Sequence, residues 1–63
     1  MTEVIKLMLV EDDIEICASY RQALKDNQKM MLCYETDSEQ EALGYVKSHN
    51  ADVIILDLNI ILN

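Results

Sequence analysis

Two groups of carboxylates in this sequence each follow directly on an apolar run. Residues 7–10 precede an acidic triplet, and residues 53–56 precede Asp57. An apolar run that is rich in β-branched residues and stops at polar ones is typical of a buried parallel strand. In open α/β sheets, ligands bind beyond the carboxyl ends of such strands. Two adjacent strands would therefore bring Glu11, Asp12 and Asp57 into one small pocket.

Carboxylates held this close repel one another unless a cation lies between them or one of them is used chemically. A hard cation such as Mg²⁺ binds a few carboxylates together with water and phosphate oxygens. We expect Asp12 and Asp57 to bind Mg²⁺ directly and Glu11 to bind it through water, with the main-chain carbonyl of Asn59 as a further ligand. A carboxylate is a nucleophile toward phosphorus once a metal withdraws charge, so Asp57 is predicted to accept a phosphoryl group.

The composition limits the class of protein. The chain of 63 residues is one domain or part of one, with a formal net charge of −7 and 51% hydrophobic residues. The hydrophobic content argues against disorder, and the negative charge disfavours direct binding to nucleic acid or to an anionic membrane. No stretch is long and apolar enough to span a bilayer and no signal-peptide pattern is present, so we expect a cytoplasmic protein. Cys17 and Cys33 match no zinc-binding spacing, and we expect reduced thiols.

The elements that would position the carboxylates alternate along the chain. The hydrophobic pattern predicts strands over 4–10, from 30 to 34 or 36, and over 53–56, with helices over 13–26 and from 38 to 48 or 49. Right-handed crossovers between parallel strands would place the first strand between the second and the third, with one helix on each face of the sheet. The predicted architecture is therefore an α/β fold of order β-α-β-α-β and strand order 2-1-3.

Local signals indicate faces and helix ends. The apolar side chains of the first helix recur at three- and four-residue spacing: Ile14, Cys17, Tyr20 and Leu24. Ser38 and Glu41 fit a capping box, in which the hydroxyl accepts from the Glu41 N–H and the Glu41 side chain reaches back. His49 and Asn50 suit the C-terminus of that helix, as residues that carry positive charge or tolerate a left-handed backbone. In the second strand, alternation would put residues 30, 32 and 34 on one face.

Three segments together suggest a family. They are 6–13 (KLMLVEDD), 37–43 (DSEQEAL) and 51–59 (ADVIILDLN), with a spacing of 45 residues from Asp12 to Asp57. In these segments the chain resembles the receiver domains of two-component response regulators. The likeness covers nearly the whole chain, and the combination is specific although each segment alone is modest. It implies a flavodoxin-like, doubly wound parallel sheet.

The resemblance also implies roles for individual residues. Glu11 and Asp12 would be the acidic pair that holds Mg²⁺, and Asn59 would contribute its main-chain carbonyl to the metal. Asp57 would be the phospho-acceptor for a sensor histidine kinase. Asp13 is expected to cap the following helix rather than to bind the metal. The chain would thus be a signalling module and not an enzyme in its own right.

The sequence also departs from the family pattern. A complete receiver has five strands and five helices, whereas residues 1–63 supply about the first half, so we interpret the chain as a partial receiver domain without strands 4–5 and helices 3–5. The output domain, which commonly binds DNA in this family, is not in the sequence. A third strand at the edge of the sheet would expose unpaired N–H and C=O groups. We therefore expect homo-oligomerisation, or pairing with a complementing fragment, through that edge.

Two other interpretations remain open at this point. The chain could be a truncated receiver fragment that self-associates but does not signal. More remotely, residues 57–59 (Asp-Leu-Asn) are similar to the nucleophile segment of haloacid dehalogenase-type aspartyl phosphatases. Those enzymes usually carry a second Asp where this chain has Asn59, and that interpretation leaves the acidic pair Glu11 and Asp12 unexplained.

Overall fold

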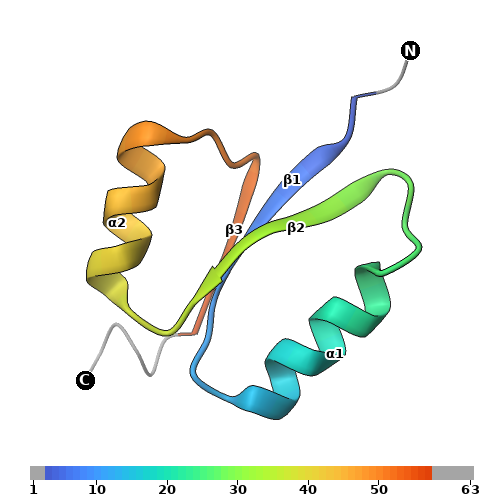
Figure 1. Cartoon of the computed structure of the whole chain (residues 1–63), viewed down its shortest axis with the longest axis horizontal. Helices are drawn as coiled ribbons and strands as arrows, with labels where there is room; N and C mark the ends of the chain where they lie inside the picture. The colour runs from blue at the N-terminus through green and yellow to red at the C-terminus, as the bar shows by residue number, and fades with distance from the viewer. Residues whose placement is uncertain (1–2, 58–63) are drawn as a thin grey trace.

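A computed structural model describes residues 3–57 of the chain. The elements follow the order β1 (Ile5–Val10), α1 (Ile14–Leu24), β2 (Met30–Thr36), α2 (Glu39–Ser48) and β3 (Val53–Leu56). The three strands are parallel and stand in the order β2-β1-β3. Figure 1 shows α1 and α2 on opposite faces of the sheet. The predicted fold class and strand order are confirmed.

The core is built on the central strand. Leu7, Met8, Leu9 and Val10 are all buried, and Leu9 has no exposed surface. Both faces of β1 are covered, which explains why its sequence is a continuous apolar run rather than an alternating one. On the α2 side, Met8 and Val10 pack with Ala42, and Tyr34, Tyr45 and Ala51 surround them.

Helix α1 begins at Ile14, because the carboxylate of Asp13 accepts hydrogen bonds from the main-chain N–H groups of Glu15 and Ile16. Of the predicted apolar stripe, Cys17 is buried and Tyr20 and Leu24 are half-buried. Ile14 is 81% exposed, so its assignment to the stripe is wrong. It is the first helical residue, in the turn that extends past the ends of the strands (Figure 1).

The start of α2 differs in part from the predicted capping box. The Ser38 hydroxyl accepts from the Glu41 N–H at 3.2 Å, as expected. The Glu41 carboxylate does not reach back to the Ser38 N–H, and instead accepts from the Thr36 hydroxyl at 2.7 Å. The Ser38 N–H donates to the same Thr36 hydroxyl oxygen at 3.1 Å. Thr36 therefore stands between the two groups that the capping box would join directly.

A main-chain hydrogen bond and a stack of three rings mark the end of α2. The His49 N–H donates to the Tyr45 carbonyl at 2.8 Å and closes the helix, as predicted. The rings of Tyr34, Tyr45 and His49 stack in sequence, with centroids 4.2 Å and 4.3 Å apart. None of residues 3–57 has a left-handed backbone, so the helix leaves through an extended His49. The stack joins α2 to β2 through side chains that come from both elements.

Strand β2 contains an irregularity that alternation could not reveal. Leu7 pairs with Leu32, but the next residue of β1, Met8, pairs with Tyr34, which leaves Cys33 as an extra residue in β2. Such a bulge shifts the faces of the strand by one residue. Leu32 and Tyr34 therefore lie on opposite faces, and the prediction that they share one is wrong.

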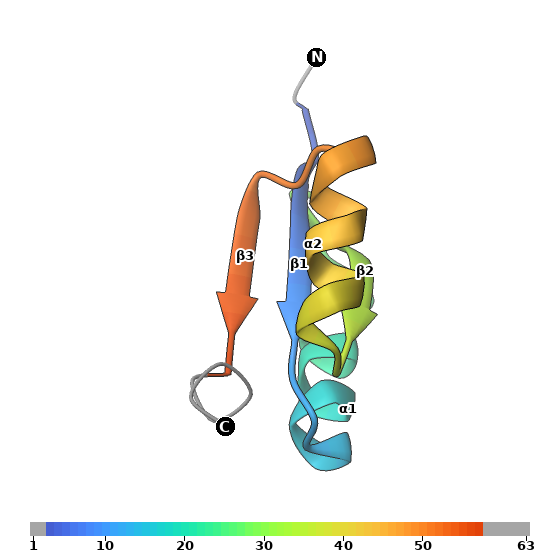
Figure 2. The same cartoon turned by 90° about the vertical axis from the view of Figure 1, so that its left-hand side faces the viewer.

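Strand β3 forms one edge of the sheet among the described residues. It pairs with β1 from Leu7↔Val53 to Val10↔Leu56. Figure 2 shows β3 at the side of β1 opposite to β2.

Both cysteine thiols are free, with Cys17 buried and Cys33 half-buried. Within residues 3–57, no helix is long and apolar enough to cross a membrane.

Candidate metal centre

The structure brings together three carboxylates that are far apart in the sequence. Glu11 and Asp12 follow β1 and Asp57 follows β3, and one carboxylate oxygen from each lies within 4.8 Å of the other two. Glu11 and Asp57 are half-buried, while Asp12 is exposed. The strands are parallel neighbours, so their carboxyl ends meet at one edge of the sheet and the side chains that follow converge there.

One peptide group fixes the backbones of two of these residues. The carbonyl of Val10 accepts from the Asp57 N–H at 2.9 Å, and the N–H of Glu11, in the same peptide group, donates to the Thr36 carbonyl at 2.9 Å. The ends of all three strands are therefore tied across the Val10–Glu11 peptide. These main-chain hydrogen bonds place Asp57 beside Glu11 independently of the conformations of their side chains.

Further contacts hold Glu11 from the side of α1. Its Oε1 atom accepts from the Asp13 N–H at 3.1 Å. Its main-chain carbonyl accepts a weak hydrogen bond from the buried Cys17 thiol, with 3.6 Å between Sγ and O. The Asp13 carboxylate caps α1, as predicted, at 2.9 Å from the Glu15 nitrogen and 3.2 Å from the Ile16 nitrogen. Glu11 is thus oriented at its N–H, its carbonyl and its side chain.

The electrostatics of the cluster are those of crowded like charges. The Asp13 N–H stabilises the Glu11 carboxylate and acts to lower its pKa, but partial desolvation, hydrogen bonding and charge from Asp57, and hydrogen bonding with Asp12 outweigh it. The net result is a Glu11 pKa above its ordinary value. Glu11 therefore holds its proton more tightly than an isolated carboxylate would, and a cation between the three carboxylates could relieve their repulsion.

The donor set fits a hard divalent cation. All three side chains offer carboxylate oxygens, and no sulfur or imidazole belongs to the cluster. Oxygen ligands, few in number and open to water, suit Mg²⁺, which keeps several water ligands. Asn59, the fourth predicted ligand, lies outside the described residues.

Sequence reasoning missed two residues that shape this region. Thr36 contacts Glu11 through its carbonyl. Arg21 forms an ion pair with Glu35, with its Nε atom 3.0 Å and 3.2 Å from the two carboxylate oxygens. Both residues border the same shallow hollow as Glu11 and Asp12. The position of Thr36, two residues before the Ser38 cap at the end of a predicted strand, was the only signal that could have identified it.

Comparison with known families gives one finding. Residues 7–61 match the response regulator receiver domain. Searches of curated proteins and of solved structures found no match at the threshold applied.

Proposed function

Because the chain belongs to the response regulator receiver domain family, we propose that Asp57 accepts a phosphoryl group from a sensor histidine kinase in an Mg²⁺-dependent reaction. The observation that supports this proposal best is the convergence of the Glu11, Asp12 and Asp57 carboxylates, with oxygens within 4.8 Å of one another. Asp12 and Asp57 would hold the ion directly and Glu11 through water. When bound, Mg²⁺ would withdraw negative charge from the phosphoryl oxygens.

The chain's own contribution is the nucleophile and its placement. An Oδ atom of Asp57 forms the new bond to phosphorus as the bond from phosphorus to the kinase's phosphohistidine nitrogen breaks. The electron pair of the broken bond returns to the imidazole, and Asp57 becomes an acyl phosphate. The hydrogen bond from the Asp57 N–H to the Val10 carbonyl, at 2.9 Å, holds the backbone of the acceptor. The module takes up one phosphoryl group and turns over no substrate of its own.

A phosphodonor experiment tests this function. The chain is incubated with acetyl phosphate and Mg²⁺, and intact mass is measured. We expect one labile phosphoryl adduct that is lost in Asp57→Asn and without Mg²⁺. Asp52→Asn is the matched control, because Asp52 lies at the opposite end of β3 and accepts there from the Lys6 N–H. An adduct that survives in Asp57→Asn, or none in the folded wild-type chain, contradicts the proposal, and turnover of a phosphate ester would indicate a phosphatase.

A second candidate function, association between copies of the chain, is favoured by the edge at β3. Val53, Ile54 and Leu56 are 44%, 43% and 49% exposed, and β3 contains no charged residue. Among residues 3–57, β3 pairs with β1 alone. An uncharged, apolar edge strand is a template for pairing with another chain.

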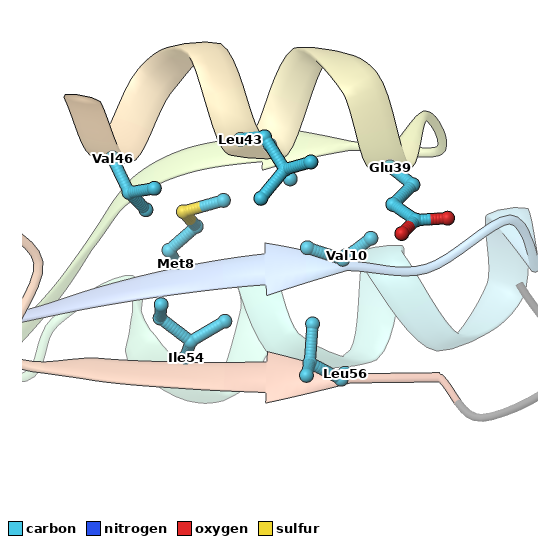
Figure 3. A pocket seen from close by; sticks show the side chains of 8 residues that line it. Met8, Val10, Glu39, Leu43, Val46, Ile54 and Leu56 are labelled. Atoms are coloured by element: carbon cyan, nitrogen blue, oxygen red, sulfur yellow. The ribbon is translucent and has the colours of Figure 1, made fainter. Parts of the chain in front are cut away.

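An apolar groove beside that edge adds surface for a second copy. Figure 3 shows the side chains that line it from three elements: Met8 and Val10 of β1, Leu43 and Val46 of α2, and Ile54 and Leu56 of β3. Glu39, the first residue of α2, adds one carboxylate near Val10. In a two-fold arrangement, β3 would pair with its own copy. The Ile54 and Leu56 side chains of each copy would then border the other copy's groove.

Sedimentation velocity at tens of micromolar tests this second candidate. We expect a dimer or a larger species that Ile54→Lys converts to a folded monomer. Ile14→Lys is the control, because Ile14 is exposed at the start of α1, which lies on the face of the sheet opposite to α2 and the groove. A folded wild-type monomer at that concentration would count against association, and binding of only a complementing receiver fragment would assign the edge to that partner.

A further inference from the structure

Thr36 connects the first turn of α2 to the acidic cluster through hydrogen bonds at two of its atoms. Its hydroxyl donates to Glu41 Oε1 at 2.7 Å and accepts from the Ser38 N–H at 3.1 Å. Its carbonyl accepts from the Glu11 N–H at 2.9 Å. The side chain is therefore held by the helix, while the main chain of the same residue holds Glu11.

The hydrogen bonds continue from Glu11 to the phospho-acceptor. The Val10–Glu11 peptide group donates its N–H to the Thr36 carbonyl. The carbonyl of the same peptide group accepts from the Asp57 N–H, also at 2.9 Å. Hydrogen bonds thus join the Glu41 carboxylate to the Thr36 hydroxyl, and the Thr36 carbonyl, through the Val10–Glu11 peptide, to the main chain of Asp57. The covalent frame of Thr36 links the two sets, and within the peptide group the two bonds polarise and orient each other.

We propose that Thr36 is a positioning residue, through which the first turn of α2 sets the relative placement of Glu11 and Asp57 and thereby the affinity of the cluster for a divalent cation. The part of this inference that concerns the cation rests on the proposed function. Binding free energies at coupled sites are reciprocal. A cation that draws the carboxylates together therefore also stabilises the first turn of α2.

The chemistry of threonine suits this position. Its hydroxyl donates to Glu41 and accepts from Ser38 at the same time, which neither an aliphatic side chain nor a carboxylate can do. The branch at Cβ restricts the side chain to few rotamers, so the hydroxyl stays aimed at the helix. Serine preserves both hydrogen bonds, whereas valine keeps the shape and removes both.

Divalent-cation affinity of the full chain is the first measurement. Mn²⁺ binding is followed by calorimetry for the wild type, Thr36→Val and Thr36→Ser. We expect Thr36→Val to weaken binding by about tenfold, the size of effect typical of groups that orient metal ligands. Thr36→Ser should stay within about twofold, because it retains the hydroxyl. Ala23→Gly serves as a control for lost stability: Ala23 is exposed on α1, and glycine there destabilises the helix without contacting Thr36, Glu11 or Asp57.

A metal-free measurement separates this inference from the proposed function. In the apo chain, we expect Thr36→Val to shift the Asp57 amide resonance and to speed its hydrogen exchange, although Thr36 ends β2 and Asp57 follows β3. Ala23→Gly and Thr36→Ser should leave that resonance in place. A separate titration uses diamagnetic Mg²⁺ in place of Mn²⁺. Adding Mg²⁺ to the wild type should slow hydrogen exchange of the Glu41 N–H, and the slowing should be smaller in Thr36→Val.

The outcomes are distinct. A wild-type chain that binds no divalent cation overturns the proposed function, and the Asp57 amide of the apo chain then decides the positioning role alone. An unshifted Asp57 amide in Thr36→Val overturns that role. So does a Thr36→Val affinity equal to that of the wild type, or a loss of affinity that Ala23→Gly reproduces.

Discussion

Three consecutive carboxylates at the end of β1 serve different purposes because the chain turns there from strand to helix. Glu11 is still bound into the sheet through its N–H. Asp13 has already become the cap of α1. Asp12, between them, is exposed and has its carboxylate near those of Glu11 and Asp57. Two neighbouring residues, Asp12 and Asp13, therefore differ in role: the first contributes to the acidic cluster and the second caps α1.

The thiol of Cys17 gives a prediction at the residue scale. Burial, and then the negative charge of Glu35, raise the pKa of Cys17 above its ordinary value of 9.0. As pH rises past 9.0, the unfolded chain loses this proton first, so the stability that the protonated thiol contributes is present below that pH and is lost as pH rises through the folded-state pKa. The excess unfolding free energy of the wild type over Cys17→Ala should be constant below pH 9 and should shrink above it.

Urea denaturation followed by circular dichroism, at several pH values from 7 to 10.5, measures this difference. Taking the difference between the two chains removes the titration of the tyrosines and lysines that they share. A difference that is the same at both ends of the pH range would mean that Cys17 titrates like an exposed thiol in the folded state.

The residues at the centre of the site could be predicted from the sequence, whereas their supports could not. Glu11, Asp12 and Asp57 each follow a strand that the hydrophobic pattern identifies, and parallel strands necessarily bring their carboxyl ends to one edge. The role of Thr36 depends on which β2 carbonyl faces the Glu11 N–H. That is a matter of register, and alternation in the sequence does not encode it.

At the scale of elements, the bulge at Cys33 determines that register. Leu7 pairs with Leu32, but Val10 pairs with Thr36. Without the extra residue, Val10 would pair with Glu35, and a different carbonyl would meet Glu11. A bulge of one residue in β2 therefore changes which residue joins α2 to the acidic cluster, and it also explains why Leu32 and Tyr34 do not share a face.

The cap of α1 gives a prediction at this scale. Asp13→Ala should lower the unfolding free energy by about 1 kcal/mol, because two main-chain N–H groups of α1 lose their acceptor. Asp13→Asn should cost less, since the amide oxygen still accepts. Both variants keep the main-chain N–H that donates to Glu11, so cation affinity should stay close to that of the wild type.

Urea denaturation and cation titration on the same samples check both parts. Asp26→Ala, which removes an exposed carboxylate beyond the end of α1, is the control and should change stability by less than about 0.5 kcal/mol. A loss of cation affinity in Asp13→Ala as large as that expected for a ligand would show that Asp13 belongs to the metal site.

The whole molecule is thin and carries a large negative charge, and its sheet is narrow. The Cα extent of the molecule is 13 Å along its shortest axis, the direction in which the three strands lie side by side (Figure 2). A narrow sheet leaves β3 with much of its surface exposed, and the net charge of −7 adds repulsion between residues as they are brought together. The hydrophobic pattern could predict each strand, but the share of β3 that stays exposed follows from what packs against it, which the pattern does not contain.

The repulsion makes a prediction for the folded chain as a whole. A cation that binds the folded state alone stabilises it by mass action, and a concentration ten times the dissociation constant contributes about 1.4 kcal/mol. We expect MgCl₂ to raise the unfolding free energy by roughly this amount beyond the effect of NaCl at equal ionic strength, which only screens charge. Asp57→Asn removes one of the crowded carboxylates. It should therefore make the metal-free chain more stable than the wild type and abolish most of the Mg²⁺ increment. Thermal or urea unfolding of both chains in each of the two salts gives the four unfolding free energies required. Equal stabilisation of the wild type by MgCl₂ and NaCl would mean that the three carboxylates bind no ion.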